Sequence, residues 1–359
     1  MYTLRQYITE ALKAEDYEAA IVMGWYELHN RELDSKSGIS SKTVETIKNN
    51  PQALDAGRKI AKFILDKNSG LAGSDAEQYG RASTKLTKFW TSYGASNKTP
   101  KTDILIGDMR FSLKIGMAQL MSGGKSESTA TFYAALKNVN TSLTKTPEFQ
   151  KTTEILESFV EASLAPTKLR PLIKSGENPV VNAGEAAHKE CMTAMGALFE
   201  SSREFKIAFA REAMSGFEKF GENDNAAAEY MLVASHDGSK VAIHSVYDDT
   251  YCEKIADKMK LQARFKTSSR KLKGKKTGEY NYWSVISLIV DAMDEELLNH
   301  DGEILNEFAF LGKVSKKIKG FFSRVWKKAS SFFKSSTSKM LKFLNIEPSV
   351  SHNKEITFD

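Results

Sequence analysis

The sequence has few of the residues that would indicate a disulfide framework, a zinc site or a membrane span. Its two cysteines, Cys191 and Cys252, lack Cys-x-x-Cys spacing, which excludes a disulfide-rich scaffold and a zinc ribbon. No apolar run reaches 18 residues, and no signal-peptide pattern is found. With 41% hydrophobic and 27% charged residues, we expect a globular, cytoplasmic protein.

Acidic residues are absent from a long stretch near the C-terminus. Ten Lys or Arg and no Asp or Glu fall between Lys313 and Lys342, so the rest of the chain carries a net charge of −4 rather than the overall +6. Apolar residues recur there every three or four positions, which predicts a basic amphipathic helix within a tail spanning 298–359. Such a helix would bind an anionic membrane surface, nucleic acid or a partner's groove, or pack on the protein itself. The residues expected to make these contacts are Lys316, Lys317, Phe321, Phe322, Trp326, Lys327 and Lys328.

The most informative stretch lies between Pro100 and Glu127. Two runs of strand-forming residues flank Gly107-Asp108, and glycine supplies the positive φ that a two-residue hairpin turn needs. Counting outward from this turn pairs Asp103 with Ser112, and paired residues share a face. One face of the predicted hairpin is therefore apolar, with Ile104, Ile106, Met109, Phe111 and Leu113, and the other face carries Asp103, Ser112 and Lys114.

The polar face of this hairpin suits metal-dependent cleavage of phosphodiesters. Carboxylates hold hard cations such as Mg²⁺ or Mn²⁺, which stabilise charge on phosphoryl oxygens and help to generate hydroxide. A lysine beside the ion can orient or deprotonate the attacking water, or neutralise the transition state. We therefore expect Asp103 and Glu127 to bind the metal and Lys114 to act at the reacting water, beside Ser112.

The spacing of Asp103, Ser112-Leu113-Lys114 and Glu127 resembles the PD-(D/E)xK nuclease superfamily. It is most similar to the type II restriction endonucleases that have Ser-x-Lys and recover the missing carboxylate from a glutamate on the next helix. The resemblance implies an α/β/α core of order αβββαβ, Mg²⁺ dependence and DNA as substrate. It also implies a metal-binding acid on the helix before the hairpin, for which Glu77 in a predicted helix from Ser74 to Ser92 is the candidate. Pro100, three residues ahead of Asp103, departs from the usual proline-aspartate pair.

Each of these residues also has a simpler explanation. Asp103 is a reasonable residue for the start of a strand, Lys114 for a solvated edge, and Glu127 for a helix N-terminus capped by Ser126. Glu212 could add a carboxylate to the site, although pairing at i,i+4 on a surface helix explains it equally. The spacing of the whole set, rather than any single residue, is what favours a nuclease site.

Further along the chain, helical and strand patterns alternate. Residues 1–30, 42–67 and 126–138 have helical periodicity, with a break near Pro51, and residues 139–222 are mostly helical. Strands are predicted at 230–234, 240–246, 260–265 and 280–289, with a helix at 249–259 between the second and third. The expected class is α+β, with an N-terminal helical segment 1–43, a nuclease-like domain 44–297 whose helical insertion spans about 139–222, and the tail.

A second basic cluster lies in the segment 260–276. It would contact the phosphates of bound DNA, or it is a solvated lysine-rich loop. Its candidate nucleic-acid-binding residues are Lys266, Arg270, Lys271, Lys273, Lys275 and Lys276.

The first eleven residues resemble the capsid-targeting helices of internal head proteins in tailed phages. In such proteins a protease cuts after Leu/Ile-x-Glu, which Ile8-Thr9-Glu10 matches, so residues 1–10 would be removed. The resemblance implies an enzyme that is packaged in the virion and has a capsid partner. If the first eleven residues are instead an ordinary amphipathic helix, the enzyme acts in the host cytoplasm.

The rival to the nuclease hypothesis is a non-catalytic internal protein of the phage that binds through its tail. The sequence leaves the oligomeric state open.

Overall fold

Two β-sheets and the helices packed on them make up the described part of the chain. The computed structural model describes residues 13–80, 85–159, 161–164, 179–268 and 280–300. These residues all belong to one compact unit. The N-terminal phage-like segment, the cluster from Arg270 to Lys276 and the basic tail all lie outside the described residues. Among the described residues, no helix is both long and apolar enough to cross a bilayer.

Within the described residues, three α-helices precede the first sheet. They are α2 (Ala14–Leu28), α3 (Ser41–Lys48) and α4 (Pro51–Lys67), and a 3-10 turn at Ser35–Ser37 lies between the first two. Asn50 caps α4 by accepting from the Ala53 N–H, and Pro51 occupies its first turn. Helices α2 and α4 approach closely because Gly24 and Gly57 lie at their contact, where a Cβ at Gly57 would be 2.2 Å from the carbonyl oxygen of Ala20.

The first sheet has the strand order β1-β2-β3-β6-β7. Strands β1 (Ala76–Gln78), β2 (Ile104–Ile106) and β3 (Met109–Ile115) form an antiparallel meander. Strand β6 (Tyr230–Ala234) then pairs in parallel with β3, and β7 (Val241–Ser245) returns antiparallel to β6. A parallel neighbour for β3 requires a long crossover connection, which the chain between β3 and β6 supplies.

The predicted hairpin is confirmed in its turn, its register and its faces. Gly107 has φ +57°, Leu105 pairs with Arg110, and Ile104 pairs with Phe111. The apolar face is fully buried, as the two-residue period requires, with Ile104, Ile106, Met109, Phe111 and Leu113 all in the core. Asp103, Ser112 and Lys114 consequently share the other face of the sheet.

The second sheet has the order β4-β9-β5, with β8 also paired to β9. Its strands are β4 (Met117–Gly123), β5 (Glu161–Leu164), β8 (Lys260–Ser268) and β9 (Tyr280–Asp291). The chain leaves the first sheet through Gly116, whose φ of +64° favours glycine. Strand β4 was not predicted. The strands predicted at 260–265 and 280–289 are present as β8 and β9, and they pair with each other and with β4 rather than with the hairpin.

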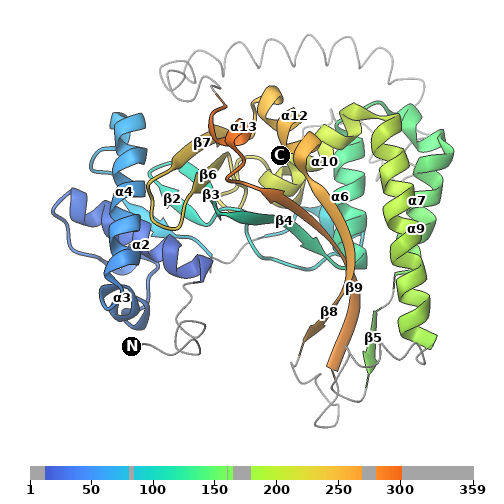
Figure 1. Ribbon diagram of the computed structural model, residues 1–359, viewed down its shortest axis with the longest axis horizontal. Coiled ribbons are helices and arrows are strands. Elements are labelled where there is room, and N and C mark those ends of the chain that lie inside the picture. The colour runs from blue at the N-terminus through green and yellow to red at the C-terminus, as the bar shows by residue number, and fades with distance from the viewer. Residues whose placement is uncertain (1–12, 81–84, 160, 165–178, 269–279, 301–359) are drawn as a thin grey trace, which may run out of the picture. The chain divides into compact units, whose positions relative to one another are not determined.

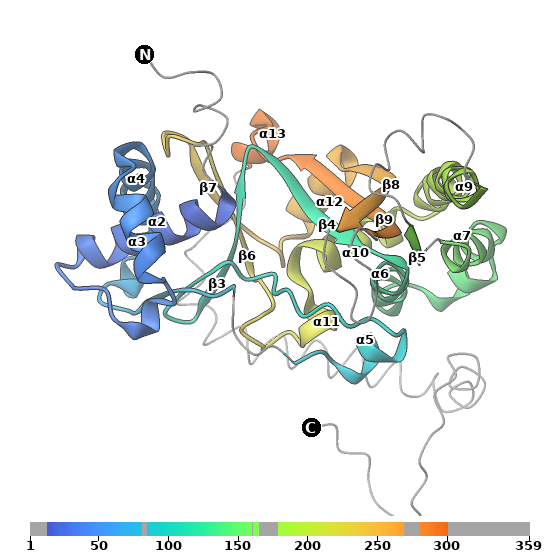
Figure 2. The same cartoon turned by 90° about the horizontal axis from the view of Figure 1, so that it is seen from below.

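Most of the remaining helices surround the second sheet. They are α6 (Lys125–Lys137), α7 (Pro147–Glu157), α9 (Pro179–Ser201), α10 (Arg203–Ser215), α11 (Phe217–Phe220), α12 (Asp249–Lys258) and α13 (Glu295–Leu298), with a 3-10 turn at Thr141–Lys145. Helices α7 and α9 lie side by side (Figure 1, Figure 2), and α9 contacts β8. Phe132, Phe149 and Phe205 join α6, α7 and α10 in one aromatic cluster.

The α+β class is confirmed, but two expected helical regions differ. The predicted helix from Ser74 to Ser92 is wrong: Ala76–Gln78 form β1, and only Lys88–Ser92 are helical, as α5. The segment 139–222, expected as a helical insertion, contains β5 as well as helices. Helix α10 of this segment packs into the main core, together with Met231 and Val233 of β6. The segment is therefore not a separate insertion.

Candidate active site

A cavity of about 330 Å³ lies where the two sheets meet the helices α6 and α10. The segment before β2 contributes Lys101 and Asp103, and β3 contributes Ser112 and Lys114. Strand β4, α6 and the end of α10 form the other walls. The cavity is lined by acids and lysines that the sequence analysis named, which are Asp103, Lys114, Glu127, Glu212 and Lys266. Lys101 and Lys219, which it did not name, line the cavity as well.

At one end of the cavity, three polar side chains form a continuous chain of hydrogen bonds. The Nζ of Lys114 donates to Ser112 Oγ at 2.7 Å and to the Leu113 carbonyl at 2.9 Å. Ser112 Oγ in turn donates to Asp103 Oδ2 at 3.2 Å, and the Leu113 N–H donates to the same oxygen at 2.7 Å. Lys114 Nζ lies 3.5 Å from Asp103 Oδ2. The expected juxtaposition of Asp103, Ser112 and Lys114 is therefore observed.

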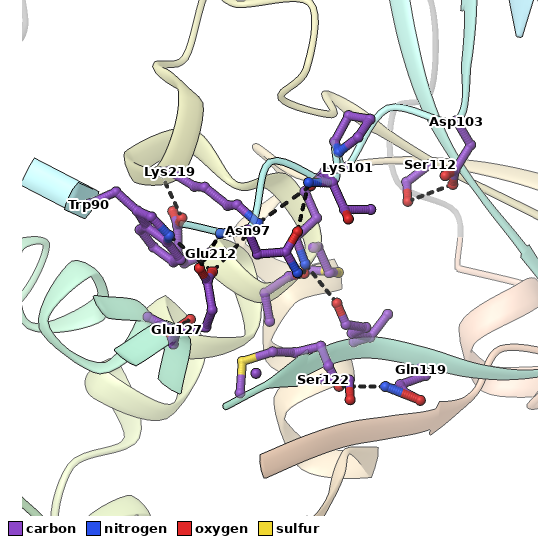
Figure 3. Close-up of a pocket in the computed structure, with 18 of the residues that line it drawn as sticks. Trp90, Asn97, Lys101, Asp103, Ser112, Gln119, Ser122, Glu127, Glu212 and Lys219 are labelled. Carbon is purple, nitrogen blue, oxygen red and sulfur yellow. Dashed lines mark hydrogen bonds and ion pairs between the residues drawn. The ribbon is translucent and has the colours of Figure 1, made fainter. Parts of the chain in front are cut away.

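Glu127 lies at the other end of the cavity. Its carboxylate accepts from Trp90 Nε1 at 3.0 Å and from the Asn97 N–H at 2.8 Å, and it lies 3.6 Å from Lys219 Nζ. Figure 3 shows Glu127 beside Trp90 and Asn97, across the cavity from Asp103. The expectation that Glu127 and Asp103 gather around one ion is not met in this geometry, because α6 directs Glu127 toward α5 and the loop after it.

Two ionisable groups are buried between these ends. Lys101 Nζ donates to the carbonyls of Leu120 and Ala213, and desolvation, followed by the charges of Lys219 and Lys114, lowers its pKa to about 7. Burial likewise raises the pKa of Glu212, which is 4% exposed, to about 7, although the N–H groups of Glu218 and Lys219 donate to it. The interpretation of Glu212 as a surface residue paired at i,i+4 is therefore wrong.

The burial of Glu212 predicts a pH-dependent stability. In the unfolded chain its pKa is near 4.5, so between pH 4.5 and about 7 the folded protein keeps a proton that the unfolded chain has lost. The free energy of unfolding therefore falls as the pH rises through this window. Glu212→Gln removes this titration, although its amide NH2 group would face one of the two N–H donors, so its stability relative to the parent should rise by roughly 2 kcal/mol between pH 4 and pH 8.

Urea unfolding at pH 4 and pH 8 measures this difference. Glu154→Gln, at an exposed position on α7, is the matched control and should leave the stability unchanged at both pH values. A stability difference between Glu212→Gln and the parent that stays the same at pH 4 and pH 8 would contradict the buried, proton-holding carboxyl.

Glu77, which was expected on a helix, lies on the edge strand β1 opposite Leu105, whereas helix α2 carries a buried acid, Glu18. Neither residue lines the cavity. Glu18 of α2 is 8% exposed and accepts from Gln78 Nε2 at 3.0 Å. Burial and then the charge of Asp103 raise its pKa to about 7, while Lys114 opposes the shift. The sequence signal that could have identified Glu18 is its position four residues before Val22, which puts an acid within the apolar stripe of the helix.

Of the six basic residues predicted to bind nucleic acid, Lys266 is the one that the structure describes. It is exposed on β8 and lines the cavity together with Gln119 of β4. Lys219 of α11 is a cavity lysine that sequence reasoning did not select; its side chain is 7% exposed, and burial lowers its pKa. Positive charge therefore borders the cavity on several sides.

The oxygen atoms near Lys114 suit a hard cation that keeps most of its waters. Asp103 Oδ2 accepts two hydrogen bonds, while Oδ1 has no described protein partner. Within the described ranges, no three His, Cys, Asp or Glu side chains come close enough to hold a metal together. An ion here would rely on Asp103, the Ser112 hydroxyl, the Leu113 carbonyl and water, which is compatible with Mg²⁺.

Comparison with known proteins adds no functional information. The chain matches no protein family, no curated protein and no solved structure.

Proposed function

We propose that this protein is a metal-dependent nuclease that hydrolyses phosphodiester bonds in DNA. The observation that carries the proposal is the hydrogen-bonded chain from Lys114 through Ser112 to Asp103 on the wall of a polar cavity. A carboxylate, a hydroxyl and an amine in this order combine metal-binding oxygen atoms with a cation at the position of the reacting phosphate.

The order of the elements around the cavity also supports a restriction-endonuclease-like core. Helix α2 precedes the antiparallel meander β1-β2-β3, and β6 pairs in parallel with β3 after a helical crossover that ends with α10 and α11. This is the αβββαβ order that the resemblance to PD-(D/E)xK nucleases implies. On this reading, strands β4 and β5 and helices α6, α7 and α9 are inserted between the third and fourth core strands, and β8 and β9, which complete the second sheet, follow β7 in the chain.

The residues that would hold Mg²⁺ or Mn²⁺ are Asp103, Ser112 and the Leu113 carbonyl, with Glu18 close to Asp103. Burial is the main cause of the raised pKa of Glu18, and the nearby charge of Asp103 is the second; a divalent cation would relieve the repulsion between the two carboxylates. When bound, the cation stabilises negative charge on the phosphoryl oxygens and makes water a better nucleophile.

The protein's own side chains have separable roles in this proposal. The Lys114 amine, held by Ser112 and Leu113, directs its charge at the reacting phosphate and orients the attacking water. Lys101 and Lys219 raise the positive potential of the cavity. Glu127 holds Trp90, Asn97 and Lys219 in place and so maintains the opposite wall.

Incubation of the full-length protein with plasmid DNA tests this function. We expect cleavage with Mg²⁺ or Mn²⁺ and none with EDTA, because the proposed mechanism needs the cation to activate water and to stabilise charge on the phosphoryl oxygens. Activity should return when Mg²⁺ is added in excess of the chelator. Cleavage that is equally fast with the chelator, or absent with every divalent metal, would overturn the proposal.

A non-catalytic DNA-binding or capsid-internal protein is the second candidate. It is favoured by one observation: both oxygens of Glu127 already accept hydrogen bonds from protein groups, as in a purely structural carboxylate. Under this alternative the basic tail, as a ligand of DNA, of an anionic membrane surface or of the capsid, would carry the function. Deletion of residues 311–345 would then abolish it, and substitution of Lys114 would not.

A further inference from the structure

Strand β8 has two chemically different faces. Leu261, Ala263 and Phe265 are partly buried toward α9, where the Ala263 N–H lies 3.2 Å from Met192 Sδ and the Phe265 ring lies 4.2 Å from that of His188. The intervening residues point the other way, because side chains alternate along a strand. This outward face is exposed and consists of Lys260, Gln262, Arg264 and Lys266.

The outward face of β8 is positively charged and runs to the cavity. Among the described residues, no carboxylate pairs with Lys260, Arg264 or Lys266; Arg264 donates instead to Ser287 Oγ at 3.2 Å and to Gln119 Oε1 at 3.3 Å. Gln119 and Lys266 both line the cavity that contains Lys114. The three positive charges thus form a row along β8, and its last member, Lys266, lines the same cavity as Lys114.

The cavity itself is narrow. Its volume of about 330 Å³ is near the lower end of the range for small-molecule sites. The Lys114 side chain is only 15% exposed and Ser112 is 2% exposed. Because β4, α6 and α10 close the walls, there is room for about one nucleotide but not for a double helix. The scissile phosphate must therefore belong to a strand that can separate from its complement.

An aromatic side chain also lies on the charged face. Trp283 of β9 pairs with Lys266 of β8, and directly paired residues share a face of the sheet. Trp283 is partly exposed. Proteins that bind single-stranded nucleic acid combine a basic track for the phosphates with aromatic rings on which the bases stack.

We propose that the substrate is an unpaired strand of DNA, whose phosphates follow Lys260, Arg264 and Lys266 along β8 into the cavity. This inference rests on the proposed nuclease function for its chemistry but not for its binding surface. The positive charge of β8 favours a polyanion as the ligand, and the recessed position of Lys114 favours an unpaired strand over a duplex.

Binding without cleavage tests the track separately from catalysis. Full-length protein carrying Lys114→Ala, in EDTA, is titrated with a labelled single strand and with a blunt duplex of the same sequence. We expect the single strand to bind at least tenfold more tightly. Adding Lys260→Ala, Arg264→Ala and Lys266→Ala should weaken this binding at least tenfold. It should also reduce the salt dependence of log K by about 0.7 for each lost phosphate contact.

The matched control carries Lys42→Ala, Lys145→Ala and Lys151→Ala, which remove the same charge at exposed positions on other elements. It should bind the single strand as the parent does. Equal losses in the two triple variants, or tighter binding of the duplex, would overturn the inference. Selective loss in the β8 variant together with an inactive wild-type protein would support the track and overturn only the nuclease function.

Discussion

Lys114→Ala is expected to reduce DNA cleavage by a factor of about 10² to 10⁴, with the fold intact. The amine is the positively charged member of the chain that links Ser112 and Asp103, and loss of one preorganised electrostatic group at a reacting centre has effects of this size. The side chain lies at the end of β3, where its removal leaves the paired backbone unchanged. Initial rates of plasmid nicking at saturating Mg²⁺ measure the loss.

Asp103→Asn should have a comparable effect for a different reason. The amide oxygen can still accept from the Leu113 N–H, so the local structure is kept, but the charge that would bind the cation is lost. We therefore expect weaker activation by Mg²⁺ together with a lower maximal rate. Circular dichroism and thermal unfolding should show both variants folded.

Lys125→Ala is the matched control for these variants. Lys125 forms an ion pair with Glu157 and does not line the cavity, and surface pairs of this kind contribute little to stability. Its cleavage rate should equal that of the parent. If Lys114→Ala and Asp103→Asn both cleaved DNA at the wild-type rate, these residues would not form the active site, even if the protein were a nuclease.

Gly57→Ala is expected to lower the free energy of unfolding by about 2 kcal/mol or more, although alanine is the better helix former. A Cβ at this position would be 2.2 Å from the Ala20 carbonyl oxygen and 2.3 Å from its carbon, so the α2–α4 contact must open. Overpacking of this kind commonly costs 1–3 kcal/mol. Since α2 carries Glu18, the displacement should also reduce activation by Mg²⁺. Urea unfolding and a metal titration measure the two effects.

Gly196→Ala on α9 is the corresponding control. No atom lies within 4 Å of a Cβ built there, and the residue is in the interior of a helix. Replacement should therefore stabilise the protein by up to about 1 kcal/mol through helix propensity alone. A destabilised Gly196→Ala, or a Gly57→Ala variant as stable as the parent, would contradict the close packing described for α2 and α4.

Several elements could be predicted from the sequence because their determinants are local. The turn at Gly107, the register that places Asp103 opposite Ser112, and helix α12 all follow from periodicity and turn residues within short segments. The misplaced helix at Ser74–Ser92 had a different cause. Its polar residues also suit an edge strand, and the pairing of Glu77 with Leu105 decided between the two.

The sequence by itself determined the hairpin and the polar face that brings Asp103, Ser112 and Lys114 together, because a two-residue period and a glycine turn leave one register. Only the tertiary structure decided which other charges reach them. Glu18, Lys101, Glu212 and Lys219 converge on the cavity, or lie beside it, from segments far apart in the chain, and β4 diverts β8 and β9 into a second sheet. Such convergence depends on packing between distant elements, which local periodicity does not encode.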